Sequence, residues 1–160
     1  MADDLTLAYL AGVIDSDGFI SIHRSTRRGR TYFAAVIGIA GTRRQPHDLA
    51  ASVWGGTVRC YDPPNPRHRP QFQWARTGDG ALSAIYDVLP HLRVKERQAW
   101  LAIECQEHVI EGRGPDPHPW MYPDYDPRPR LEEMRVEMVG VLNQDRRAPL
   151  DGRTWDEYPR

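Results

Sequence analysis

The stretch Leu-Ala-Gly-Val-Ile-Asp-Ser-Asp-Gly, residues 10–18, ends an apolar helix and opens a strand. Around it, apolar or small residues recur at spacings of three and four, which is typical of one helix face; they are Leu5, Ala8, Tyr9, Gly12 and Val13. Gly18 is a stop signal, so we expect the helix to end near Asp17. The small residues Ala8, Ala11 and Gly12 would let a second helix approach closely, and they predict a dimer interface.

Two carboxylates at the end of this helix are chemically unusual. A helix C-terminus carries partial negative charge and disfavours a carboxylate by about 0.3–1 kcal/mol, yet Asp15 and Asp17 both lie there. A second copy of the helix would bring more carboxylates to the same place, and hard cations such as Mg²⁺ prefer carboxylate oxygens. The acids alone also fit a glycine-capped helix with two solvated side chains.

The nine residues together closely resemble the motif that names the LAGLIDADG homing endonucleases. They match it at seven of nine positions and differ by Val13 for Leu and Ser16 for Ala. The resemblance implies a site-specific DNA endonuclease of intron or intein mobility, which makes a staggered double-strand break in a long pseudo-palindromic target. Because 160 residues hold a single motif, it also implies a homodimer.

Downstream of the motif, the hydrophobic pattern alternates with the period of a strand. Residues 19–25 and 32–40 read as two strands joined by a turn at Arg28-Gly29-Arg30, with Ile20, Ile22, Phe33, Ala35, Ile37 and Ile39 on the apolar face. A helix is expected from about Gln45 to Gly55, a third strand over residues 57–61 and a fourth over residues 71–76. A helix follows over residues 77–88, and the segment 92–98 then leads into another helix, marked by Trp100, Leu101, Ile103, Glu104 and Val109.

This order of elements predicts a mixed α/β chain of the α+β class with antiparallel pairing. It matches the αββαββα core implied by the resemblance, with a four-stranded antiparallel saddle sheet, over residues 1–111. Residues 112–160 form a Pro-rich segment, an amphipathic C-terminal helix marked by Leu131, Met134, Met138 and Leu142, and a polar tail. This extension could cover the core, contact flanking DNA or be a solvated surface.

The charge is unevenly distributed along the chain. The formal net charge is −1, but residues 19–76 hold ten Arg and two acids between two acidic segments. A local basic footprint favours a polyanion as partner. One sheet face, with the turn and loops beside it, is polar and suits the reading of double-stranded DNA, although any antiparallel sheet can have a solvated polar face. The DNA-binding candidates are Ser21, His23, Ser25, Arg27, Arg28, Arg30, Tyr32, Arg43, Arg44, Thr57, Arg59, Tyr61, Arg67, Arg69, Gln71 and Gln73.

The resemblance also implies roles for individual residues. Asp17 would be the metal ligand for Mg²⁺, with Mn²⁺ expected to substitute, and Lys95 would help to stabilise the charge that develops on the scissile phosphate. Asp15 and Gly18 would hold the geometry of the motif. Many relatives have a water-positioning Gln where this chain has Gly41, so the sequence does not identify that residue.

The alternative function is a non-cleaving nucleic-acid binder on the same fold, either a maturase for intron RNA or a DNA-binding regulator.

The composition of the chain narrows the range of further partners and the cellular compartment. Cys60 and Cys105 are too few for a disulfide framework or a zinc site. No apolar run is long enough for a membrane span, and the N-terminus lacks the positive region of a signal peptide. We therefore expect a soluble, cytoplasmic protein with no membrane partner.

Overall fold

The computed structural model describes residues 2–65, 67–111 and 128–147. The chain begins with helix α1 (Asp4–Asp17), followed by β1 (Gly18–Arg27), β2 (Arg30–Gly41), α2 (Gln45–Trp54), β3 (Arg59–Tyr61) and β4 (Gln71–Thr77). Helix α3 (Asp79–Val88), the short 3₁₀ helix η1 (Leu89–His91), α4 (Glu96–Glu111) and α5 (Arg128–Arg147) complete it. The predicted order of elements and the α+β class are therefore confirmed.

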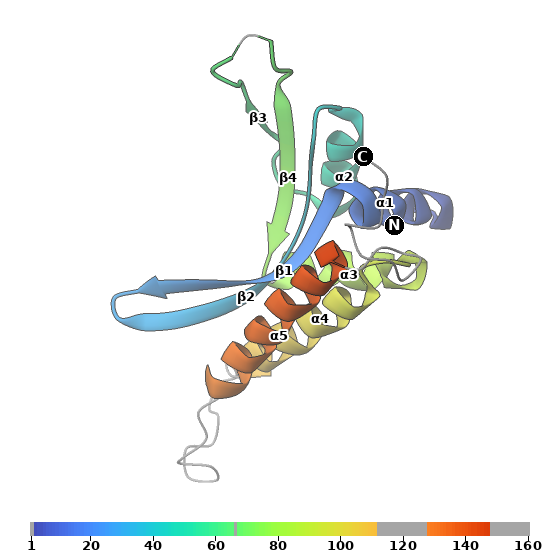
Figure 1. Ribbon diagram of the computed structural model, residues 1–160. Helices are drawn as coiled ribbons and strands as arrows, with labels where there is room; N and C mark the ends of the chain where they lie inside the picture. The colour runs from blue at the N-terminus through green and yellow to red at the C-terminus, as the bar shows by residue number, and fades with distance from the viewer. Residues whose placement is uncertain (1, 66, 112–127, 148–160) are drawn as a thin grey trace.

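The four strands form one antiparallel sheet in the order β1-β2-β4-β3. Strand β2 pairs with β1 over residues 30–39, but β4 reaches only residues 36–41 of β2. The β1–β2 hairpin and the β3–β4 pair consequently project as two arms, and the helices lie on one side of both arms (Figure 1). The hairpin turn uses positive φ at Arg28 (50°) and Gly29 (76°), which is the turn geometry that matches the twist of paired strands.

The core lies between the sheet and the helices. Ile20, Ile37, Ile39 and Trp74 are buried on the inner face of the sheet, as the alternation predicts. Helix α4 packs on β1, β2 and α3, and α5 packs on α4 and β1. Leu131, Met134 and Met138 of α5 are buried in the same cluster, so the described part of the C-terminal extension belongs to this core.

Several predicted boundaries differ from the structure: both strands of the hairpin are longer than predicted, and two later elements begin further along the chain. The third strand begins at Arg59 rather than at Thr57, because Gly55 and Gly56 have positive φ and the chain straightens only after them. Helix α3 begins at Asp79 rather than Thr77, because Gly78 has φ 61° and separates it from β4.

The apolar face predicted for α1 is not the face that packs on the core of its own chain. The side chains that α1 buries are Leu10, Ala11 and Ile14, whereas Leu5 is 81% and Tyr9 51% exposed. Apolar residues occur all round this helix, so its periodicity could not decide which face the sheet would cover. Within the described residues, no helix is both long and apolar enough to cross a membrane.

Candidate active site and nucleic-acid interface

Tight backbone packing fixes the junction between α1 and β1. A Cβ added at Gly18 would lie 2.6 Å from Ile14 Cα and 2.8 Å from the Gly38 carbonyl oxygen. The φ of Gly18 is −94°, so glycine is required here by space rather than by a left-handed conformation. The chain can therefore pass directly from the last turn of α1 into β1, which places Asp17 at the corner.

Asp15 lies in the last turn of α1 and contacts the segment that precedes α4. Its carboxylate accepts hydrogen bonds from the backbone N–H groups of Arg93 (2.7 Å), Val94 (3.2 Å) and Lys95 (3.0 Å). The Lys95 ammonium in turn donates to the backbone carbonyl oxygen of Asp15. The structure thus brings two of the sequence candidates together, although they are 80 positions apart in the chain.

Asp17 is exposed at the end of the same helix. Within residues 2–65, 67–111 and 128–147, no group of three or more His, Cys, Asp or Glu side chains could hold a metal ion. One exposed carboxylate supplies the oxygen donor that Mg²⁺ prefers but not a complete ligand set. Further ligands would have to come from a second chain, a nucleic-acid phosphate or water.

The candidates for a dimer interface divide into two groups. Gly12 is exposed, and a Cβ added there would meet nothing within 4 Å; Ala8 is half-buried. Ala11 is 0% exposed because the core of its own chain covers it, so its side chain does not belong to the exposed face of α1. The outer face of α1 consists instead of Leu5, Tyr9 and Gly12.

Strand register shows which predicted DNA-binding side chains share the outer face of the sheet. Residues opposite one another in antiparallel strands point to the same face. The outer pairs are Ser21↔Val36, His23↔Ala34, Ser25↔Tyr32, Arg59↔Gln73 and Tyr61↔Gln71. Arg27 belongs to the same set as His23 and Ser25, because all three alternate with the buried Ile20 and Ile22.

The remaining candidates lie beside the sheet. Arg28 forms the hairpin turn, Arg43 and Arg44 precede α2, Thr57 precedes β3, and Arg67 and Arg69 lie in the β3–β4 loop. Arg44 Nε is 3.1 Å from an Asp48 carboxylate oxygen, in an exposed pair. The Arg30 side chain is outside the described residues, and Gly41 ends β2.

Arg24 belongs to the basic segment, residues 19–76, but its side chain does not lie on the outer face of the sheet. It lies opposite Phe33, on the inner face, and its Nε is 3.5 Å from a Glu132 carboxylate oxygen of α5. Hydrogen bonding from Arg135, together with the charges of Arg135 and Arg24, holds the pKa of Glu132 below its usual value. Helix α5 therefore contacts the underside of the hairpin arm through charge as well as apolar packing.

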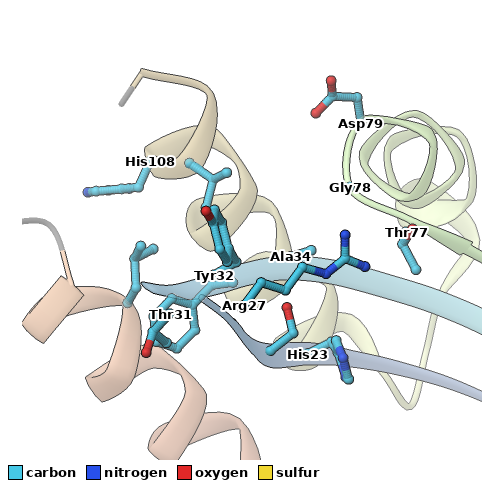
Figure 2. Close-up of a pocket in the computed structure, with 13 residues that line it drawn as sticks. His23, Arg27, Thr31, Tyr32, Ala34, Thr77, Gly78, Asp79 and His108 are labelled. Carbon is cyan, nitrogen blue, oxygen red and sulfur yellow. The ribbon is translucent and has the colours of Figure 1, made fainter. Parts of the chain in front are cut away.

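An open pocket of about 1020 Å³ adjoins the hairpin arm. Its lining combines the predicted residues His23, Ser25, Arg27 and Tyr32 with residues that the sequence analysis did not single out, among them Thr77, Asp79 and His108. Figure 2 shows that these come from β1, β2, the β4–α3 junction and α4. No local sequence signal could have grouped them, because β2, β4 and α4 meet here only through tertiary packing.

Comparison with solved structures agrees with this geometry. The homing endonuclease I-CvuI in complex with its target matches with a TM-score of 0.60 at 19% identity, over 86% of this chain and 82% of that one. The archaeal intron-encoded homing endonuclease I-Vdi141I, complexed with DNA, matches with a TM-score of 0.66 at 15% identity, over 88% of this chain and 86% of that one. The chain has the homing-endonuclease fold.

The share of each matched chain that is covered shows that this chain has the length of the single-motif LAGLIDADG proteins. The homing endonuclease I-TnaI matches over 89% of this chain and 99% of that one, with a TM-score of 0.57 at 14% identity. The LAGLIDADG homing endonuclease I-GzeII, in complex with its DNA target, matches 94% of this chain but only 46% of its own, with a TM-score of 0.50 at 10% identity. No protein-family profile and no curated protein sequence matches the chain.

Proposed function

We propose that the protein is a homodimeric, metal-dependent, site-specific DNA endonuclease that makes a staggered double-strand break in a long pseudo-palindromic target. The observation that carries this proposal is the corner at Asp17. There the exposed Asp17 carboxylate ends α1, whose outer face is apolar. The Lys95 ammonium is bonded to the Asp15 carbonyl oxygen in the last turn of the same helix. This corner lies at the junction with the sheet whose outer face is polar.

The exposed face of α1 supports the dimer. Leu5 and Tyr9 are large apolar side chains that stand mostly in solvent, and Gly12 leaves room for close approach of another backbone. A two-fold axis along this face would bring the two Asp17 carboxylates together. A Cβ at Gly12 would meet nothing within 4 Å, so Gly12→Glu adds bulk and charge to this exposed face and should abolish dimerisation in light-scattering measurements while the monomer stays folded.

The catalytic chemistry follows from these positions. Two Asp17 carboxylates and phosphate oxygens of DNA supply hard donors that fit Mg²⁺, or Mn²⁺ in its place. When bound, such ions polarise the scissile phosphate and lower the pKa of an attacking water. Asp17 would hold them, and the Lys95 ammonium would stabilise the negative charge that develops on the phosphate.

Target recognition is assigned to the outer face of the sheet. Arg59 and Gln73 lie opposite one another, as do Tyr61 and Gln71, and Arg suits guanine while Gln suits adenine in the major groove. Arg27 and the neighbouring turn supply charge for phosphate contacts, so binding should weaken steeply with salt.

The test is a selection of bound and of cleaved duplexes from a random DNA library, with wild type and Asp17→Asn in Mg²⁺ and in Ca²⁺. Cut products from wild type in Mg²⁺ alone, with staggered ends on a pseudo-palindrome, are expected. Asp4→Asn is the matched control, because it neutralises a carboxylate at the opposite end of the same helix. Enriched binding by both wild type and Asp17→Asn with no cutting would contradict the enzyme and favour a regulator or maturase, for which structured intron RNA is the next substrate.

A further inference from the structure

The contacts of Asp15 connect the motif helix to Lys95 at two points. Its carboxylate accepts three successive backbone N–H groups from Arg93 to Lys95, and its carbonyl oxygen accepts the Lys95 ammonium. The Lys95 carbonyl accepts the Ala99 N–H at 2.9 Å, so Lys95 is also the residue from which α4 starts. The backbone and the ammonium group of Lys95 are therefore both fixed relative to Asp15 of α1.

The free energies of these hydrogen bonds indicate that Asp15 does more than end helix α1. A carboxylate in the last turn of a helix is disfavoured by the helix dipole. Three hydrogen bonds from backbone N–H groups to an ionised acceptor offset that cost, and such bonds are about twice as strong as neutral ones. The same three N–H groups precede α4, where no residue of α4 itself can accept them.

The Lys95 ammonium also gains order from this contact. A lysine side chain has about 2 kcal/mol of rotamer entropy to lose when it is held in one place. Donation to a carbonyl at the C-terminus of α1 places the positive charge where the helix dipole favours it. Asp17 follows Asp15 by two residues in the same turn, so whatever fixes Lys95 to Asp15 also fixes it relative to Asp17.

We propose that Asp15 is a positioning residue for the cleavage reaction, which holds the Lys95 ammonium at the end of α1 beside the Asp17 corner. Asp15 itself touches neither DNA nor metal in this assignment. The inference rests on the proposed nuclease function for its kinetic consequence, but the tether itself can be measured without any activity.

The first experiment uses the fact that Lys95 is the only lysine in the sequence. Protein grown with ¹³C,¹⁵N-lysine gives NMR signals from one side chain. In wild type the Cε–Hε signals should differ from those of the urea-unfolded chain, and in Asp15→Asn they should move towards the unfolded position. Asp79→Asn is the matched control, since Asp79 also contacts α4, through Gln106 at 2.9 Å, and it should leave the Lys95 signals unchanged. Unchanged Lys95 signals in a folded Asp15→Asn protein would show that the Asp15 carboxylate does not hold the Lys95 ammonium in place, and would refute the positioning assignment.

The second experiment is a double-mutant cycle on the single-turnover cleavage rate. Asp15→Asn should slow cleavage by about 100-fold, the order expected for a misplaced catalytic group, with the Kd for DNA in Ca²⁺ unchanged. In a Lys95→Met background it should cause no further loss, because the residue through which it acts is gone. An equal loss in both backgrounds would show a purely structural role and refute the positioning assignment.

The two experiments also separate this inference from the proposed function. If wild type does not cleave DNA in Mg²⁺, the nuclease proposal and the kinetic role of Asp15 both fail, while the NMR result still decides the tether. If wild type cleaves and Lys95→Met cleaves equally well, the nuclease stands and the positioning role of Asp15 is refuted.

Discussion

Two glycines of the nine-residue motif, Gly12 within α1 and Gly18 at the start of β1, should respond to the same substitution with opposite signs. Alanine at Gly18 places a Cβ 2.6 Å from Ile14 Cα, 2.8 Å from the Gly38 oxygen and 2.9 Å from the Ile14 oxygen. All three are backbone atoms, so no side-chain rotation can relieve the contacts. Overpacking of this kind costs about 1–3 kcal/mol, and we expect the upper end, about 3 kcal/mol.

Alanine at Gly12 should instead stabilise the folded chain. Its Cβ meets nothing within 4 Å, and Ala is favoured over Gly in a helix interior by about 0.8–1.0 kcal/mol. The two variants should then differ in the free energy of unfolding by about 4 kcal/mol. For a chain of this size 1 kcal/mol shifts Tm by about 2–4 °C, so Gly18→Ala should melt about 6–12 °C below wild type.

The assay is urea unfolding followed by far-UV circular dichroism, at a concentration where light scattering shows a monomer. That condition matters because Gly12 lies on the proposed dimer face, where a Cβ could act through association. A Gly18→Ala protein as stable as wild type, or a Gly12→Ala monomer less stable than wild type, would refute the packing described for α1.

Four further predictions concern the core, the two thiols and the outer face. Gln106 is buried and bonds Ala35 N–H at 3.0 Å; Gln106→Leu leaves that donor unsatisfied and should cost about 1–3 kcal/mol in urea unfolding. Burial raises the pKa of Cys105 to about 12, so above pH 9 the unfolded chain loses this proton first and stability should fall with rising pH, less so in Cys105→Ala. At pH 8 a thiol reagent should label exposed Cys60 but not Cys105 in the native protein. Arg27→Ala should reduce the salt dependence of DNA binding by about one unit of slope if it contacts a phosphate, whereas Arg24→Ala, on the same strand but the inner face, should leave the slope unchanged.

Local sequence patterns were sufficient for most of the elements. Gly18 ended the helix at Asp17, the alternation from Ile20 to Ile39 marked the hairpin and its buried face, and Gly55-Gly56 ended the second helix. Each of these depends on residues within a few positions of one another, where backbone conformation and side-chain period are set locally. The motif also predicted the fold, which the structural comparisons confirm.

Only the tertiary structure decided which helices, strands and distant residues contact one another. Helix α1 is apolar all round, so the choice to bury Ala11 and expose Tyr9 depended on where the sheet and α3 came to lie. The strand order β1-β2-β4-β3 likewise follows from packing, because β4 must cross to reach β2. The contact between Asp15 and Lys95 spans 80 positions of the chain, and a local hydrophobic periodicity cannot predict a contact between residues so far apart in sequence. The sequence determined the local elements and the motif residues, and long-range packing alone placed the lysine on the motif helix.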